Sequence, residues 1–246
     1  MKNWSPNTYG DAWADVYDET FSWLDDTDET VEAVLEHAQH GPVLELGVGT
    51  GRISLPLARA GIETYGIDAS AKMLAKLKSK SGGMEISVHL GDFSDFNLDR
   101  SFSVIFLTRN TLSEIPTQEA QVSCMRAIAR HLMPGGSAII DLAVPRPERA
   151  DGIPRVTRVN EGTVTLLARS VDVVTQHSTA HRIRFGAEGT HVGVIRDRYI
   201  WPSELDLMAQ LAGMTLCSRN ADWRGSPFNA DSVAHVSRYT LASASG

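Results

Sequence analysis

The spacing of apolar residues changes along the chain, and each change predicts a different kind of structure. Between residues 7 and 39, apolar side chains recur every three or four positions with acidic residues between them, which is typical of amphipathic helices. Between residues 43 and 143, short apolar runs alternate with segments of helical period, which predicts parallel strands joined by helices. Between residues 145 and 201, the helical period is absent, and alternating Val, Thr, Ile and Arg predict antiparallel strands.

The short apolar runs are predicted to be the strands of one Rossmann-like α/β sheet with helices on both faces. Ser70, Thr117 and Ser203 stand where helix N-caps are expected. An unbroken apolar run such as 102–108 is typical of a strand covered on both faces. The predicted strands are 43–46, 62–67, 84–90, 102–108, 137–143, 214–219 and 233–241, and the predicted helices are 28–40, 53–60, 71–79, 117–131 and 204–212.

The segment after the fifth predicted strand interrupts this α/β pattern. Hairpin signals such as Glu161-Gly162 separate its apolar runs, and the alternation of charged and apolar residues predicts that one face contacts water. Its strands are expected at 155–160, 163–174, 178–185 and 192–200. We therefore expect N-terminal helices and an α/β core in 1–145, a small antiparallel β insertion in 146–201, and a helix with the last two core strands in 202–246.

A glycine-rich turn after the first strand carries the clearest chemical signal. The turn is Gly47-Val48-Gly49-Thr50-Gly51, and Asp68 ends the next predicted strand. Glycine permits positive φ and close approach of the backbone to a ligand, and a carboxylate at the end of the second strand can accept both hydroxyls of a ribose. The third glycine comes two positions after the second, whereas the dinucleotide fingerprint needs three. Glu45, just before the turn, would repel a pyrophosphate but could hold an ammonium group.

With Glu45, the glycine turn and Asp68 in this arrangement, the chain resembles the class I S-adenosylmethionine-dependent methyltransferases. A second point of similarity is the stretch Leu132-Met133-Pro134-Gly135-Gly136 between a predicted helix and the fifth strand. The insertion resembles the lid sheet of amino-sugar and glycine-type methyltransferases. The resemblance implies S-adenosyl-L-methionine as cofactor, S-adenosyl-L-homocysteine as its product, and a small-molecule acceptor beneath the lid.

The resemblance also implies which residues contact the cofactor. Glu45 and the glycine turn would lie against its methionine part, and Asp68 would hold its ribose. Tyr17 would contact its carboxylate or flank the methyl group, and Asp92 would accept the adenine amine, although turn capping is an alternative role for this aspartate. The expected contacts are Tyr17, Glu45, Gly47, Gly49, Gly51, Arg52, Asp68, Ala69, Met73, Asp92, Phe93, Thr108 and Arg109, of which Met73 is equally compatible with core packing.

Polar residues directly after the fourth strand are predicted to face the acceptor. Because ligands of α/β sheets bind outside the carboxyl ends of the strands, Thr108, Arg109 and Asn110 should line the reacting centre, with a surface ion pair as the alternative for Arg109. The loop from Trp223 to Phe228 is rich in large apolar groups and either borders the pocket or packs on the sheet. The expected substrate contacts are Tyr9, Trp13, Asn110, Glu114, Arg198, Trp201, Trp223 and Phe228.

Methyl transfer from a sulfonium requires alignment and exclusion of water. Desolvation alone lowers the pKa of an amine acceptor, whereas a hydroxyl acceptor would benefit from a general base. The catalytic candidates are Tyr17, Asn110, His181 and His191, and Glu114 is a further candidate base. We expect methyl transfer to nitrogen or oxygen of a small molecule of specialised metabolism, with nitrogen favoured by the lid resemblance and the acidic composition. An O-methyltransferase, a non-catalytic S-adenosylmethionine-binding protein and, less favoured, a Rossmann dehydrogenase stay open.

Composition restricts the partners and the compartment. The 246 residues carry a net charge of −7, which argues against nucleic acid as a partner. No apolar run is long enough to span a bilayer, and the first six residues carry no export signal, so we expect a cytoplasmic protein. Cys124 and Cys217 are expected to be small buried hydrophobic residues, and the histidines lack the spacing of a metal site. The sequence is compatible with a homodimer but does not determine the oligomeric state.

Overall fold

A seven-stranded sheet forms the centre of the computed structural model, which describes residues 5–21, 25–149, 151–187 and 189–242. Within these residues the strand order is β10-β11-β5-β4-β1-β2-β3, with β10 and β11 antiparallel to their neighbours and the others parallel. The strands are β1 (Val43–Leu46), β2 (Thr64–Asp68), β3 (Ser87–Leu90), β4 (Phe102–Leu107), β5 (Leu132–Ala143), β10 (Met214–Asn220) and β11 (Ala234–Leu241).

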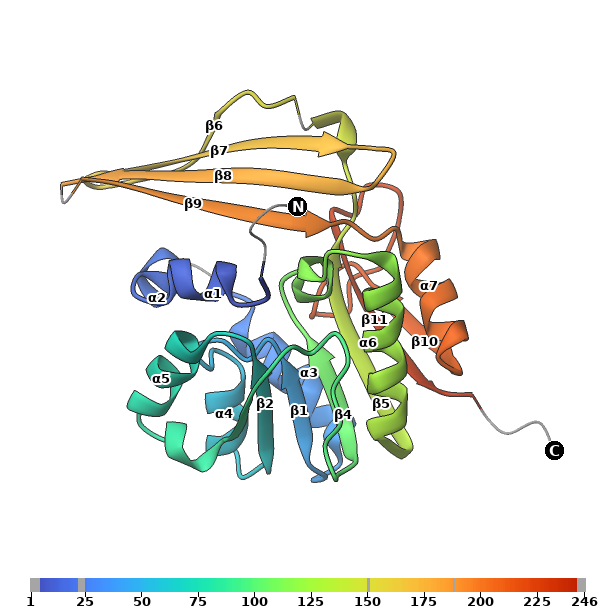
Figure 1. The fold of residues 1–246 in the computed structure, drawn as a ribbon. Coiled ribbons are helices and arrows are strands. Elements are labelled where there is room, and N and C mark those ends of the chain that lie inside the picture. Colours follow the sequence, from blue (N-terminus) through green and yellow to red (C-terminus); the bar gives the residue numbers. More distant parts are fainter. Residues whose placement is uncertain (1–4, 22–24, 150, 188, 243–246) are drawn as a thin grey trace.

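Helices cover both faces of this sheet (Figure 1). On one side α6 and α7 pack together, and on the other α3 and α4 lie against the parallel strands. The helices are α1 (Thr8–Trp13), α2 (Tyr17–Thr20), α3 (Thr27–Ala38), α4 (Ser54–Arg59), α5 (Ala71–Ser79), α6 (Gln118–His131) and α7 (Pro202–Leu211), with short 3-10 turns η1 (Gly83–Glu85), η2 (Thr111–Glu114) and η3 (Pro147–Arg149). The predicted α/β fold class is therefore confirmed.

Local sequence signals explain where α5, α6 and α7 begin. The hydroxyl of Ser70 accepts the N–H of Met73 at 3.2 Å, and that of Thr117 accepts the N–H of Ala120 at 3.2 Å, as N-caps do. Ser203 was expected to cap α7, but this prediction is wrong: Trp201 is the N-cap, and Pro202 occupies the first turn, where its missing N–H costs nothing.

Two strands differ most in length from their predictions. The segment 84–90 contributes only β3 (Ser87–Leu90), because η1 occupies its first residues. β5 begins at Leu132 and not at residue 137, so the Pro134-Gly135-Gly136 stretch belongs to the strand. Of the two cysteines, Cys124 is buried as expected, whereas Cys217 is exposed on edge strand β10.

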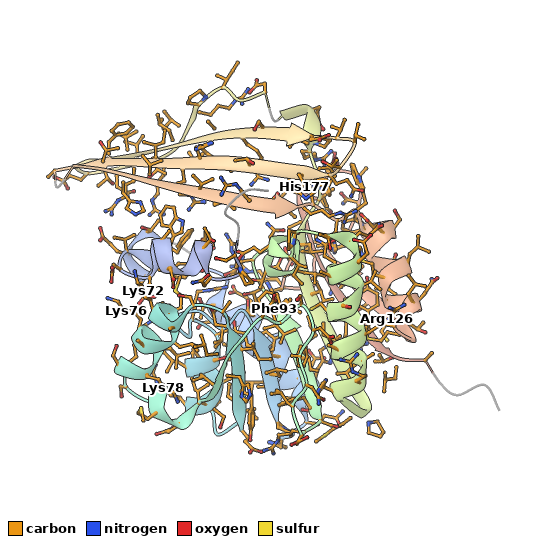
Figure 2. All side chains as sticks on the ribbon, in the orientation of Figure 1. Lys72, Lys76, Lys78, Phe93, Arg126 and His177 are labelled. Carbon is orange, nitrogen blue, oxygen red and sulfur yellow. The ribbon has the colours of Figure 1, made fainter. Side chains whose placement is uncertain are left out.

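The insertion forms a second sheet, the lid, which lies over α1 and α2 (Figure 1). In the described part of the chain it consists of the antiparallel strands β6 (Arg155–Asn160), β7 (Thr163–Asp172), β8 (His177–Gly186) and β9 (Gly189–Arg198). A Cβ atom at Gly193 would overlap the ring of Trp13, so the glycine allows β9 to lie directly on α1. At the other end of the lid, His177 Nε2 lies 2.8 Å from the carbonyl oxygen of Pro116, near α6 (Figure 2).

A sheet that covers a core usually turns its apolar side chains inward and its charged side chains toward water. In the lid this distribution is reversed at several positions. Arg169, Arg182 and Asp197 point inward toward the α/β core. Val164, Phe185 and Val192, which alternate with them along the strands, are exposed on the outer face. The charged face of the alternating pattern therefore covers an internal space, which makes this space polar.

Three expectations from the sequence remain predictions. They are the division of the chain at residues 145 and 201, the cytoplasmic location and the homodimer. Residues 1–4, part of the region that was searched for an export signal, lie outside the described residues. In the ranges that the structure describes, no helix is both long and apolar enough to cross a membrane, and no group of three His, Cys, Asp or Glu side chains is placed to hold a metal ion.

Candidate functional site

A cavity of about 340 Å³ lies between the carboxyl ends of the parallel strands and the inner face of the lid. The strand order reverses here, because the chain passes from β1 outward to β3 and then returns to the other side of β1 as β4. The glycine turn, the end of β2, the η2 turn, helices α1 and α2 and the lid all contribute side chains. Its lining includes Tyr9, Tyr17, Glu45, Gly47, Gly49, Arg52, Asp68, Ala69, Met73, Phe93, Thr108, Arg109, Asn110, Glu114, Asp141, Arg169, Arg182 and Asp197.

The glycine turn is folded so that its backbone faces Asp68. Gly47 and Gly49 both have positive φ, and the N–H of Gly49 donates to Asp68 Oδ2 at 2.8 Å. The other carboxylate oxygen accepts the N–H of Ser70 at 2.8 Å. Burial raises the pKa of Asp68, and the two N–H donors oppose this effect. Each oxygen retains a lone pair, so the fixed carboxylate can still accept two hydroxyl groups.

Glu45 is buried behind the turn at the end of β1. Its Oε2 atom accepts a hydrogen bond from the hydroxyl of Ser54 at 2.5 Å. Burial raises the pKa of Glu45 to about 7, against the opposing effects of Ser54 and of nearby Arg52. A cation bound in the cavity would favour the ionised carboxylate, since it would replace the water that burial has removed.

Arg52 connects the glycine turn to the N-terminal helices. Its Nη1 atom lies 2.7 Å from Asp26 Oδ1, whereas its Nη2 atom is buried and has no hydrogen-bond partner in the described part of the chain. Asp18 makes a similar connection, because it accepts the hydroxyl of Thr50 at 2.6 Å. The N-terminal helices are thus held over the turn, and a buried guanidinium N–H is left for an anion.

These groups fit S-adenosylmethionine, the cofactor that the sequence predicts. The free lone pairs of Asp68 match its ribose hydroxyls, the carboxylate of Glu45 matches its ammonium group, and the unpaired Nη2 of Arg52 matches its carboxylate. A Cβ atom at Gly49 would meet no neighbouring side chain, so the turn leaves open space on the side of the cavity. The hydrogen-bonding and charged groups of the cavity are therefore those that would bind a nucleoside with a cationic amino-acid part.

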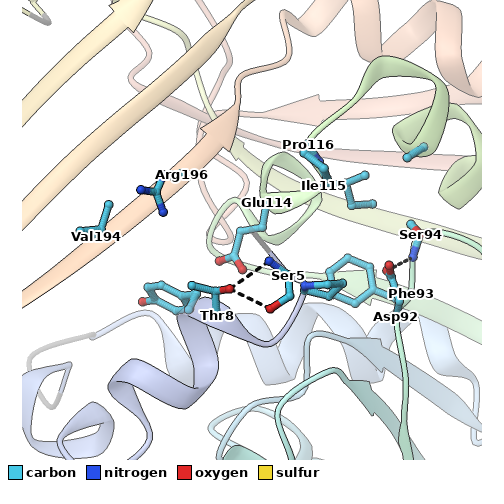
Figure 3. Close-up of a pocket in the computed structure, with 13 residues that line it drawn as sticks. Ser5, Thr8, Asp92, Phe93, Ser94, Glu114, Ile115, Pro116, Val194 and Arg196 are labelled. Atoms are coloured by element: carbon cyan, nitrogen blue, oxygen red, sulfur yellow. Dashed lines mark hydrogen bonds between the residues drawn. The ribbon is translucent and has the colours of Figure 1, made fainter. Parts of the chain in front are cut away.

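The region expected to hold adenine is shared with a second, smaller cavity. Asp92 Oδ1 accepts the N–H of Ser94 at 2.8 Å, which is the turn-capping role, and Oδ2 accepts no hydrogen bond from the described residues. Asp92 lines the smaller cavity of about 250 Å³, while Phe93 lines both (Figure 3). Met73 is almost fully buried and also borders the larger cavity. Turn capping by Asp92 and core packing by Met73 are thus both compatible with a position beside the cofactor.

The second and third residues after β4 adopt a conformation that non-glycine residues rarely adopt. Arg109 and Asn110 have φ values of 58° and 65°. Asp141 on β5 holds them, since its Oδ2 accepts the N–H of Arg109 at 3.0 Å and its carbonyl oxygen accepts the N–H of Asn110. The side-chain oxygen of Asn110 accepts the N–H of Ala143 at 2.5 Å. These hydrogen bonds to β5 hold the strained turn in place, and both side chains line the cavity.

Glu114 is the acidic group at the centre of the site. It ends η2, lines both cavities, and lies between the N-terminal segment and β9 (Figure 3). Its carboxylate makes no hydrogen bond or ion pair with any side chain that the structure describes. Burial, with smaller contributions from Asp68 and Asp197, raises the pKa of Glu114 to about 8. A carboxylate that is largely withdrawn from water without a partner is costly, so this group is poised to bind a cation or to carry a proton.

Two tyrosines of the N-terminal helices accompany Glu114. Burial raises the pKa of Tyr17 to about 12 and that of Tyr9 well above its usual value, and the charge of Glu114 adds to both effects. Both phenols therefore stay protonated at neutral pH and can only share hydrogen bonds. Neither is a general base.

The lid supplies charges that the sequence analysis did not assign to the site. Arg169 Nη1 on β7 lies 3.4 Å from Asp197 Oδ2 on β9, on the same inner face of the lid. Asp197 Oδ1 is buried without a hydrogen-bond partner in the described ranges, and burial raises the pKa of Asp197. Arg182 completes this roof. Only the pairing register of β7, β8 and β9 brings the three residues together.

Several predicted site residues lie outside the cavity lining. Trp13 is fully buried between α1 and the lid, with the ring of His191 packed on it at 4.8 Å between centroids. His181 is exposed and stands on the outer face of the lid. The structure places Gly51 in helix packing against Leu55 and Leu77. Trp13, His181 and His191 do not line the cavity, and neither does Gly51. None of these residues therefore belongs to the candidate site.

The predicted substrate contacts from the C-terminal part have structural partners instead. Arg198 is buried in an ion pair with Glu204, at 2.7 Å, and Trp201 is exposed at the start of α7. Trp223 is buried and donates its indole N–H to Asp141 Oδ2 at 3.3 Å. Phe228 packs on His235. Trp223 thus supports the site indirectly, the ion pair holds Arg198, and ring packing holds Phe228.

Two acidic residues of the site carried a weak sequence signal or none. Asp141 interrupts the apolar run of β5, as Glu45 interrupts that of β1, and this pattern could have pointed to it. Asp26 bridges Arg52 and Arg109, at 2.7 Å and 3.5 Å, and nothing in the acidic N-terminal segment distinguishes it from its neighbours.

Comparison with known proteins gives a consistent set of relatives. Residues 43–136 match the model of a family described as methyltransferase domain. The chain is 31% identical over 234 residues to cypemycin N-terminal methyltransferase from Streptomyces sp, covering 92% of this chain and 95% of that protein.

Solved structures agree with this similarity. The CcbJ methyltransferase from Streptomyces caelestis superposes with a TM-score of 0.90 at 36% identity, over 98% of this chain and all of that chain (100%). The sugar N-methyltransferase KedS8 from Streptoalloteichus sp has a TM-score of 0.69 at 22% identity, over 99% of each chain, and shows a likeness of fold.

Proposed function

Because the chain belongs to the class I S-adenosylmethionine-dependent methyltransferases, we propose that it methylates an amine of a small molecule and that Glu114 binds this amine. The family and the cofactor are given by the comparisons, and the acceptor atom is the new element. The observation that carries the proposal is the carboxylate of Glu114, which is partly buried, lines the cavity and has no hydrogen-bond or ion-pair partner among the described side chains.

A carboxylate in this position suits an amine for two reasons. An ammonium group would pair with ionised Glu114 and so remove the cost of its burial. The pKa of about 8 for Glu114 is close to that of an α-amino group, about 7.7–8.0. A proton can therefore move from the bound ammonium to Glu114, which exposes the nitrogen lone pair.

The remaining residues align the acceptor and exclude water. When bound, S-adenosylmethionine supplies a methyl group on a positively charged sulfur. Tyr9 and Tyr17, as protonated phenols, can donate to or accept from the amine and hold its orientation. Asn110, fixed through Ala143, limits the position of the acceptor from below, and the lid closes the cavity from above. This arrangement supports catalysis by positioning, with Glu114 as proton acceptor.

The names of the relatives support nitrogen over oxygen. The relative that covers most of the chain is described as acting at an N-terminus. A further relative, 31% identical over 148 residues, is described as an N,N-dimethyltransferase of an amino sugar. These relatives also support a role in specialised metabolism.

An oxygen acceptor has less support in the described site. His181 and His191, the histidine bases considered for it, do not line the cavity. Glu114 would then be the base, but a hydroxyl group has no positive charge to stabilise the carboxylate. O-methyl transfer therefore lacks the pairing that makes an amine a good ligand.

The test is methylation of a panel of small amines, amino sugars, short peptides and phenols, with the methyl group located by fragmentation mass spectrometry. We expect methyl on nitrogen only. Glu114→Gln should lower kcat by about 10²-fold or more while S-adenosylhomocysteine affinity changes little. Glu119→Gln, an exposed neutralisation on α6, is the matched control and should leave kcat unchanged. Methylation of phenol oxygens alone, or full activity of Glu114→Gln, would overturn the proposal.

A further inference from the structure

The guanidinium of Arg182 faces the cavity from the lid without an acidic partner. It lies over the rings of Phe21, at 4.8 Å from the centroid, and Trp13, at 5.8 Å. Within the described ranges it makes no ion pair and no hydrogen bond. Cation–π contacts hold the side chain in place, but they use the flat face of the guanidinium and leave its N–H donors free.

The other arginines of the cavity differ in this respect. Arg52 and Arg109 both pair with Asp26, and Arg169 pairs with Asp197. Burial lowers the pKa of Arg182, and the neighbouring charges of Arg109 and Arg169 lower it further. The roof of the cavity therefore carries positive charge that no described carboxylate balances, which is unfavourable until an anion binds.

The anion is not expected to be the carboxylate of the cofactor. Arg52 stands beside the glycine turn and has its own unpaired N–H for that group. Arg182 lies over the ring of Trp13, whose centroid is 6.2 Å from that of Tyr9, so its guanidinium stands toward α1 and Tyr9.

Tyr9 also relates Arg182 to Glu114. Both charges act on the pKa of this phenol, in opposite directions, and all three side chains line the same cavity. A ligand that reaches both would present a positive group to Glu114 and a negative group to Arg182. Arg169 and Arg109, although paired, add to the positive potential at the second position.

We propose that Arg182, assisted by Arg109 and Arg169, binds an anionic group of the acceptor, so that the acceptor is an amine that also carries a carboxylate or a phosphate. This inference rests on the proposed N-methyl transfer and adds a second recognition element to it. Bidentate donation from the free guanidinium suits the paired oxygens of either anion.

The experiment compares acceptors that differ only in the anion. L-alanine is compared with L-alaninamide, and glucosamine 6-phosphate with glucosamine, as acceptors for the wild type and Arg182→Gln. We expect kcat/KM to favour the anionic member of at least one pair by about 10- to 100-fold, and Arg182→Gln to abolish this preference without slowing the neutral member. The pair that shows the effect distinguishes a carboxylate from a phosphate.

Arg184→Gln is the matched control. Arg184 is on the same strand and the same face, but it pairs with Glu19 and does not line the cavity. It should keep the preference. S-adenosylhomocysteine affinity should change less than two-fold in Arg182→Gln, whereas a ten-fold loss would assign Arg182 to the cofactor carboxylate and overturn the inference.

The two proposals fail in different ways. Methylation of amines with no preference for the anionic members leaves the N-methyltransferase intact and removes the anion site. If no probe is methylated, the anion site is tested by calorimetric titration of the S-adenosylhomocysteine complex with inorganic phosphate and acetate at constant ionic strength. Saturable binding by the wild type that is lost in Arg182→Gln supports it, and equal or absent binding in both proteins overturns it.

Discussion

Replacing Glu114 by Gln should make the protein less sensitive to alkaline pH, because the wild-type carboxyl is protonated in the folded state. Its pKa is raised by burial to about 8, while an unfolded glutamate titrates near 4.3. Between these values the folded protein binds a proton that the unfolded chain has lost, so stability falls as pH rises. Above pH 8 the stabilising effect of the bound proton is gone.

The magnitude follows from the width of this window. Each pH unit within it costs about 1.4 kcal/mol of unfolding free energy. Going from pH 6 to pH 9 crosses about two of these units, so Glu114 should account for a loss of about 2–3 kcal/mol in the wild type. Glutamine does not titrate and is nearly isosteric, so Glu114→Gln should lack this part of the loss.

Urea denaturation at pH 6 and pH 9, without cofactor, measures the effect directly. Glu45, with a pKa of about 7, contributes to the same trend in both proteins, so the informative quantity is the difference between wild type and variant. Glu119→Gln, which removes an exposed carboxylate, should behave as the wild type. An equal loss of stability in wild type and Glu114→Gln between the two pH values would refute the assignment of a protonated, buried Glu114.

Three further variants test the cofactor half and the lid. Asp68→Ala should weaken S-adenosylmethionine binding by about 1–3 kcal/mol in calorimetry, because charge-assisted hydrogen bonds to the ribose are lost, and unchanged affinity would contradict the ribose assignment. Gly49→Val should prevent binding in the same assay, since its side chain would enter the cavity at a φ of 54°, with the far-ultraviolet circular dichroism spectrum as the check of folding. Gly193→Ala should force β9 away from Trp13 and lower the free energy of unfolding by about 1–3 kcal/mol. Tryptophan fluorescence should shift to longer wavelength as the indole becomes hydrated. An unchanged spectrum and an unchanged denaturation midpoint would show that the lid does not pack there.

The cofactor half of the site could be predicted from the sequence because it is local. The glycine turn, Glu45 and Asp68 belong to one strand–turn–helix–strand unit, and the conformational needs of that unit restrict which residues can occupy it. The strand order that brings Thr108, Arg109 and Asn110 to the same edge follows from the general rules for such sheets. For this half of the site, residue type and position in the chain are enough to make the prediction.

The acceptor half could not be predicted in the same way. A charged residue in a β-strand can point to either face, and a shift of one residue in register moves it to the other. The alternation in the lid predicted one water-facing side, but Arg169, Arg182 and Asp197 face the cavity. Trp223 and Phe228 lie outside the cavity lining for a related reason, since large apolar groups in loops fill gaps in packing as readily as they line pockets.

The two halves of the site therefore depend on different parts of the chain, and this has a consequence for specificity. The groups proposed to hold the cofactor come from β1, β2 and the glycine turn, whereas the lid charges come from β7, β8 and β9 and pair with none of those groups. A substitution at Arg169, Arg182 or Asp197 can thus change the acceptor without a cost to cofactor affinity. Glu114 cannot vary so freely, because its burial beneath the lid is stabilised only when a cation or a proton accompanies it. Relatives that share the fold should keep an acid at this position where the acceptor is an amine and should differ most in the inward-facing charges of the lid.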